Sequence, residues 1–161
     1  MTERVSPTRM ELLARRGQIA LARQGRDLLK EKRNVLMKQF MKVAELVIVS
    51  SDELERLAAA ARHALALAEA VEGDDAVRSA SFAARGEVSL TVERGHVTGV
   101  PVPLIEKRSL SRSLLDRGYS LAGSSARIDR VAQRFEDELN LVVEIAASEA
   151  RLRRLIEEIR Q

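Results

Sequence analysis

The sequence predicts a mainly α protein, a long antiparallel two-helix coiled coil whose closed end carries a short β-hairpin and loop insertion. In two stretches the apolar residues return at alternating steps of three and four, and the segment between these stretches lacks that period. A mean spacing of 3.5 residues allows knobs-into-holes packing against a second helix. The composition agrees, because 45% of the residues are hydrophobic but only 2% are aromatic, which suits a helical seam better than a globular core.

The first element is a helix from Pro7 to about residue 72, with Ser6 as its N-cap and Pro7 at its first helical position. At 1.5 Å per residue this helix is roughly 100 Å long, so we expect a rod. The apolar residues keep the same spacing of three and four beyond Ser50, which predicts one continuous helix. We expect this helix to end at Gly73. Its apolar positions are Leu12, Ile19, Ala22, Leu29, Leu36, Phe40, Val43, Val47, Leu54, Leu57, Ala61, Ala64 and Ala68.

The middle segment, residues 73–123, changes to the two-residue period of a half-buried strand. We predict a strand over 88–92, a turn at 94–96 and a return strand over 97–104 with a bulge at Gly99. Pro101 and Pro103 cannot donate ladder hydrogen bonds, so the hairpin should be short, with an exposed edge. A short helical stretch is expected at 109–116.

The third element is a helix that begins at Ser124 or Ser125 and runs to the end, giving regions 1–72, 73–123 and 124–161 of one elongated unit. Phe135 and Leu139 are expected to pack against the first helix. The predicted coiled-coil seam consists of Leu29, Leu36, Phe40, Val43, Val47, Leu54, Ile128, Phe135, Leu139 and Val142.

No pattern in the sequence predicts an active site. Cysteine is absent, no glycine-rich phosphate loop is present, and His63 and His96 lack a second ligand at metal-binding spacing. We therefore expect no catalytic residue, no cofactor and no metal. No apolar run approaches the ~20 residues that cross a bilayer, so direct membrane insertion is not expected.

Charge is unevenly distributed along the chain. Residues 1–42 hold 11 Lys and Arg against 4 Asp and Glu, although the net charge of the chain is only +3. A solvated helix face explains this asymmetry, and a partner with an acidic lining is the alternative. Nucleic-acid binding is disfavoured, because stacking aromatic residues are absent near Lys30–Arg33.

Several motifs resemble the D subunit of the archaeal and bacterial A/V-type ATP synthases, over nearly the whole chain. One departure is Asn34, where the family usually has Asp. The motifs are Val5-x-Pro7-Thr8-Arg9-x-x-Leu12, Gly25-x-x-Leu28-Leu29-Lys30-x-Lys32-Arg33-Asn34-x-Leu36, Gly99-Val100-Pro101-Val102-Pro103, Tyr119-Ser120-Leu121, Ile128-Asp129-x-x-Ala132 and Glu149-x-x-Leu152-x-x-Leu155-x-x-Glu158-Ile159.

The resemblance implies a non-catalytic central-stalk rotor that transmits torque between ATP synthesis or hydrolysis and proton or sodium translocation. Its open end would enter the hexamer of A and B subunits, and its hairpin would lie near the F subunit and the membrane-side rotor connector. Such a subunit is cytoplasmic and peripheral to the membrane. The residues expected to contact the hexamer are Pro7, Thr8, Arg9, Arg15, Arg16, Arg23 and Arg26.

The family continues with more helix beyond the position of Gln161, which suggests a fragment. The second helix would then be ~55 Å long against ~100 Å for the first. The apolar stripe from Leu12 to Leu29 would lack an intramolecular partner, so the isolated chain would fray there or form a homodimer. A self-associating coiled-coil scaffold or adaptor, and less so a basic rod that binds nucleic acid, are the alternative functions.

Overall fold

The computed structural model describes residues 8–83, 90–105, 117–119 and 124–160. The chain divides into two compact units, residues 1–39 (the N-terminal unit) and 40–161 (the C-terminal unit). Its elements are the helix α1, Arg9–Glu72, the helix α2, Asp74–Ala83, the strands β1, Val92–Val97, and β2, Val100–Ile105, and the helix α3, Ala126–Arg160.

Helix α1 begins at Arg9, and Thr8 caps it. The backbone N–H of Glu11 donates to the Thr8 hydroxyl at 3.3 Å, and the N–H of Leu12 donates to the Thr8 carbonyl at 3.0 Å. A threonine oxygen at this position satisfies N–H groups that have no partner within the helix. The predicted cap, Ser6, and Pro7 lie outside the described residues.

The prediction that the first helix is continuous is confirmed, because α1 runs unbroken through Ser50 and Ser51 to Glu72. The Ser51 hydroxyl donates to the carbonyl of Val47 at 2.8 Å, so this polar side chain is satisfied without interrupting the helix. The helix ends before Gly73, as predicted, where φ is +87°.

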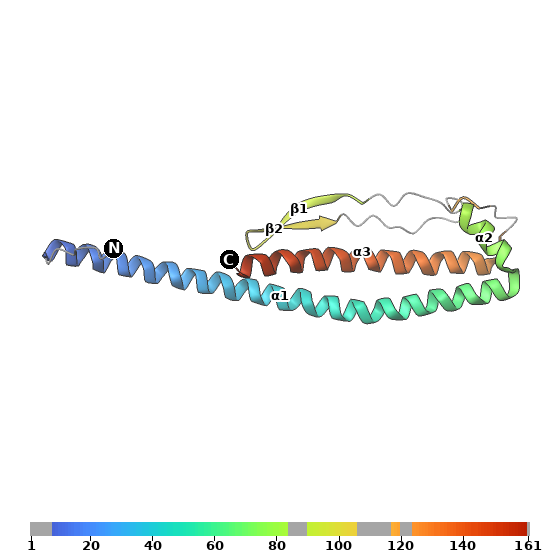
Figure 1. Ribbon diagram of the computed structural model, residues 1–161, viewed down its shortest axis with the longest axis horizontal. Coiled ribbons are helices and arrows are strands. Elements are labelled where there is room, and N and C mark those ends of the chain that lie inside the picture. Colours follow the sequence, from blue (N-terminus) through green and yellow to red (C-terminus); the bar gives the residue numbers. More distant parts are fainter. Residues whose placement is uncertain (1–7, 84–89, 106–116, 120–123, 161) are drawn as a thin grey trace, which may run out of the picture. The chain divides into compact units, whose positions relative to one another are not determined.

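Within the C-terminal unit, the latter part of α1 and the whole of α3 lie side by side and run in opposite directions (Figure 1). The end of α1 meets the start of α3, where the Arg127 guanidinium lies 3.6 Å from the Glu72 carboxylate. The predicted fold class, two antiparallel helices with a short hairpin, is confirmed. The buried side chains of these two helices within this unit are Ala58, Ala61 and Ala68 of α1 and Ile128, Val131, Ala147 and Leu155 of α3.

The hairpin turn lies at Thr98–Gly99, so the predicted turn at 94–96 and the predicted bulge at Gly99 are wrong. The pairing of β1 with β2 is regular from Val92 opposite Ile105 to Val97 opposite Val100. Thr98 and Gly99 both have positive φ, 53° and 80°, which matches the two-residue turn that suits the strand twist. Gly95, which had indicated a turn, instead leaves room within β1 for the side chain of Leu104. Of the predicted first strand, residues 88 and 89 lie outside the described residues, 90 and 91 are not in a strand, and only Val92 belongs to β1, so the predicted bounds are wrong.

The hairpin packs on α3 through β2. Val100 and Val102 are 3% and 2% exposed, whereas Pro101 between them is exposed. Two prolines on β2 also remove N–H donors from that strand, which limits pairing with another chain. The hairpin is therefore attached to the coiled coil by one apolar face.

Helix α2 was not predicted, although the sequence holds its signal. Asp74 and Asp75 occupy its first turn, where negative charge favours the helix dipole. The N–H of Val77 donates to the Gly73 carbonyl at 3.3 Å, so the same glycine ends α1 and begins α2.

The helical stretch expected at 109–116 lies outside the described residues. Ser125, one of the two residues expected to open the last helix, caps α3 through a 3.4 Å bond from the N–H of Ile128 to its hydroxyl.

Candidate interaction surfaces

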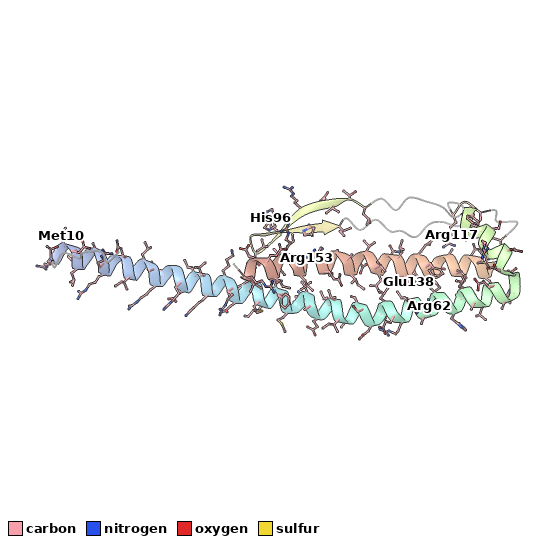
Figure 2. All side chains as sticks on the ribbon, viewed as in Figure 1. Met10, Arg62, His96, Arg117, Glu138 and Arg153 are labelled. Carbon is pink, nitrogen blue, oxygen red and sulfur yellow. The ribbon has the colours of Figure 1, made fainter. Side chains whose placement is uncertain are left out.

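The N-terminal unit exposes most of its apolar side chains. Among residues 8–39, only Leu36 is buried. Leu12 and Ile19 are 52% and 51% exposed, and Leu29 is 68% exposed. Met10, labelled in Figure 2, lies at the start of this segment and is also largely exposed. Since helical stability in water comes mostly from packing an apolar face, this stripe is a candidate binding surface.

Three of the predicted contact arginines form a stripe of unpaired positive charge. Arg9, Arg16 and Arg23 lie seven residues apart, so they share one helix face. They have no ion-pair partner among residues 8–83, 90–105, 117–119 and 124–160, and we call them the cationic stripe.

The other predicted contact residues differ from the stripe. The Arg15 guanidinium pairs with Glu11 at 2.9 Å. Arg26 likewise pairs with its neighbour Asp27 at 2.9 Å. Thr8 is exposed and caps α1, and Pro7 lies outside the described residues.

The predicted seam residues are distributed unevenly between the core and the surface. Leu36 and Ile128 are buried, whereas Leu29 is largely exposed. On α3, Val131 and Ala147 are buried although they are not predicted seam positions. This helix packs against β2 as well as α1. The remaining seam residues are either half-buried, as for Phe40, Val43, Val47 and Leu54, or about 40% exposed, as for Phe135, Leu139 and Val142.

A buried ion pair links the part of the chain at 117–119 to α3. Arg117 is 7% exposed, and Figure 2 shows it at the end of the C-terminal unit where α2 lies. Its Nε and Nη2 donate to the two carboxylate oxygens of Glu136, both at 3.0 Å. Its Nη1 donates to the backbone carbonyl of Asp129 at 3.4 Å. The hydrogen bond to Glu136 raises the pKa of Arg117, so its charge persists at every physiological pH.

Tyr119 extends this cluster. Its hydroxyl donates to Oδ1 of Asp129 at 2.8 Å. Burial raises the pKa of the Tyr119 phenol, and the hydrogen bond to Asp129 raises it further. Gly118 brings the segment against α2, since a Cβ at this position would lie 2.5 Å from the carbonyl oxygen of Ala83. The cluster therefore holds α2 and α3 together.

The described polar groups of the Arg117 cluster bond to one another, Arg117 to Glu136 and Tyr119 to Asp129. Within the part of the chain that the structure describes, no three metal-ligating side chains lie together. His63 and His96 are exposed and lie on α1 and β1. Sequence reasoning missed this cluster, because the ion pair joins residues nineteen positions apart and leaves no periodic signal.

A two-helix coiled coil with a docked hairpin and an exposed apolar stripe is typical of proteins that pack against other chains. The chain belongs to the family of the ATP synthase D subunit, whose family model matches residues 11–161. Membership of this family makes it a non-catalytic subunit of the A-type ATP synthase. None of the described helices has a stretch long and apolar enough to span a bilayer.

Curated relatives agree over nearly the whole chain. The A-type ATP synthase D subunit of Thermococcus kodakarensis is 39% identical over 155 residues, which cover 96% of this chain and 72% of the relative. That of Methanosphaera stadtmanae is 35% identical over 155 residues, with coverage of 96% and 72%. That of Haloarcula marismortui is 35% identical over 159 residues, with coverage of 99% and 69%.

Proposed function

We propose that the chain is the central rotor shaft that carries torque between the A/B hexamer and the membrane rotor of the synthase. Membership of the D-subunit family is the observation that carries this proposal. Paired antiparallel helices in the C-terminal unit support it, because a coiled coil resists twisting better than one helix. The coupled ion is a proton or sodium, and the shaft itself hydrolyses no ATP.

The partners proposed for the two units rest on membership of the D-subunit family. The hairpin and α2 belong to the unit that faces the F subunit and the membrane-side rotor connector. The segment from residue 7 to 32 docks on the inner lining of the A/B hexamer. In this arrangement the shaft is cytoplasmic and attached to the membrane only through the complex.

Two features of the N-terminal unit support its role at the hexamer. The cationic stripe has no compensating carboxylate among the described residues, so it attracts acidic or carbonyl-rich surface. The exposed leucines and isoleucine beside it supply apolar area, which is the main driving force for association.

Binding to a purified A/B hexamer tests this docking. The variant Arg9→Glu/Arg16→Glu/Arg23→Glu should bind about tenfold or more weakly, and the affinity of the unaltered chain should fall with salt. The control Arg62→Glu/Arg94→Glu/Arg153→Glu makes the same charge change at exposed positions of the C-terminal unit. Equal losses in the two variants would contradict docking through the stripe.

Self-association is the second candidate, and the same exposed apolar residues favour it. Sedimentation across a range of concentrations distinguishes the two, since a scaffold remains dimeric when the hexamer is present. Hydrogen exchange on the monomer should show weak protection from Leu12 to Leu29. Strong protection in a demonstrated monomer would contradict an unpartnered stripe.

A further inference from the structure

A small groove lies between α1 and α3 near the end where the two helices meet, within the C-terminal unit. Its volume is about 240 Å³. Four residues of α1 and three arginines of α3 line it, namely Ala60, His63, Ala64, Leu67, Arg127, Arg130 and Arg134. We call it the arginine groove.

The three arginines of the groove are not equivalent. Arg127 lies 3.6 Å from Glu72, and that pair joins the end of α1 to the start of α3. Arg130 and Arg134 are exposed and have no hydrogen bond or ion pair with any described residue. Two carboxylates one turn further along α3, at 137 and 138, form no ion pair with Arg134 either.

The stability of α3 does not explain Arg130. Arg127 lies in the first turn of α3 and pairs with Glu72, whereas Arg130 lies just beyond that turn and has no such partner among the described residues. Arg130 and Arg134 therefore place two uncompensated positive charges on the same groove, which favours an anionic partner there.

The floor of the groove is narrow and apolar. Ala60 and Ala64 are half-buried and present only methyl groups, and Leu67 is 51% exposed at the rim. A helix that packs here must therefore bring a small apolar residue to the floor. The spacing of the cations also fits a helix, since Arg130 and Arg134 are four residues, ~6 Å, apart along α3. Two carboxylates four residues apart on a partner helix have the same spacing.

We propose that the arginine groove is the docking site for a partner α-helix with two carboxylates one turn apart and a small apolar residue between them. The partner is a protein and not a nucleic acid, because no Phe, Tyr or Trp is among the described residues that line the groove. This proposal goes beyond the rotor role, because binding of a partner helix between α1 and α3 does not depend on rotation.

A synthetic helical peptide is the probe for this site. It carries Glu at two positions four residues apart with Ala between them, and a second peptide has Gln in place of both Glu. Fluorescence anisotropy with the full chain should show tighter binding of the Glu peptide, with affinity that falls as salt is added. Equal binding of the Gln peptide would overturn the proposal.

Charge reversal locates the binding. Arg130→Glu/Arg134→Glu should weaken binding of the Glu peptide about tenfold. The same variant should bind a third peptide that has Lys in place of both Glu. The matched control Arg153→Glu/Arg160→Glu alters two exposed arginines of the same helix and should leave the affinity unchanged. If the charge-reversed variant loses the helical circular dichroism signal, Arg130→Gln/Arg134→Gln is used instead. An unchanged affinity, or tighter binding of a single-stranded DNA oligonucleotide through the same arginines, would overturn the assignment.

Discussion

Arg117 and Glu136 form a two-pronged ion pair, in which Nε and Nη2 of the arginine each lie 3.0 Å from one carboxylate oxygen. The pair joins residue 117 to the first half of α3, and both side chains are mostly buried, with 7% and 16% exposed. Because each charge has lost most of its hydration, each depends on the other.

Glu136→Gln should destabilise the fold by about 3 kcal/mol, because it removes the nearer carboxylate from the buried Arg117 and leaves only that of Asp129, whose Oδ1 lies 3.9 Å from Nη1. Urea unfolding measures the change. The control is Glu157→Gln, which breaks the exposed Arg154–Glu157 pair at 2.8 Å and should cost under about 0.5 kcal/mol. Similar losses in the two variants would mean that Arg117 finds another partner or more water than its burial indicates.

The ionisation of Tyr119 should make the fold sensitive to alkaline pH. Burial and the hydrogen bond to Asp129 raise the pKa of the Tyr119 phenol above the ordinary value of 10.0. Because the folded pKa exceeds the unfolded one, this contribution is complete below about pH 10 and is lost as pH rises through the folded pKa. Tyr119 is the single tyrosine of the chain, so its ultraviolet phenolate absorbance follows this residue alone. A midpoint below 10 in the folded chain would refute the buried hydrogen bond, and Tyr119→Phe should remove the transition.

Gly118→Ala should destabilise the fold by about 3 kcal/mol, since the new Cβ would meet the Ala83 carbonyl and φ is +83°. Gly73→Ala is the matched control, because φ is +87° there but nothing lies within 4 Å of the added atom. That control should cost only about 1 kcal/mol, the conformational penalty alone. Equal costs in thermal or urea unfolding would show that the segment does not pack against α2.

Thr98→Asn should stabilise the hairpin by about 1 kcal/mol. Thr98 has φ 53°, a conformation that β-branched residues rarely adopt and that Asn tolerates. Asn followed by Gly is also the preferred sequence of this two-residue turn. Thr98→Val is the control, since it keeps the branched shape and should bring no gain. An Asn variant no more stable than the Val variant would contradict the turn geometry.

The helices could be predicted from sequence because their signal is local and periodic. The apolar stripe repeats along α1, and Gly73 marks its end, so both features needed no knowledge of distant contacts. The hairpin could be predicted but not its turn, because Gly95 and Gly99 give the same signal and only the packing of Leu104 distinguishes them. Helix α2 was missed because Gly73 followed by two aspartates also fits a turn, where Gly and Asp are common.

Contacts between distant segments left no comparable pattern. The sequence predicts that Phe135 packs against the first helix, and the structure leaves it 39% exposed at the edge of an apolar groove that also contains Leu65 and Val77. The periodic pattern does not reveal that α3 must also accommodate β2. The Arg117–Glu136 pair and the arginine groove likewise depend on which helices meet, and only the structure shows this.

Rotation of the chain during ATP hydrolysis is the most direct test of the central claim. The chain has no cysteine, so Asp75→Cys at the exposed start of α2 provides one attachment point for a bead or fluorophore. The labelled chain is assembled with immobilised A/B hexamer and followed by single-molecule microscopy while ATP is supplied. A rotor shaft predicts rotation in one direction that stops when ATP is withdrawn. A label that stays fixed while the same complexes hydrolyse ATP would contradict the rotor role.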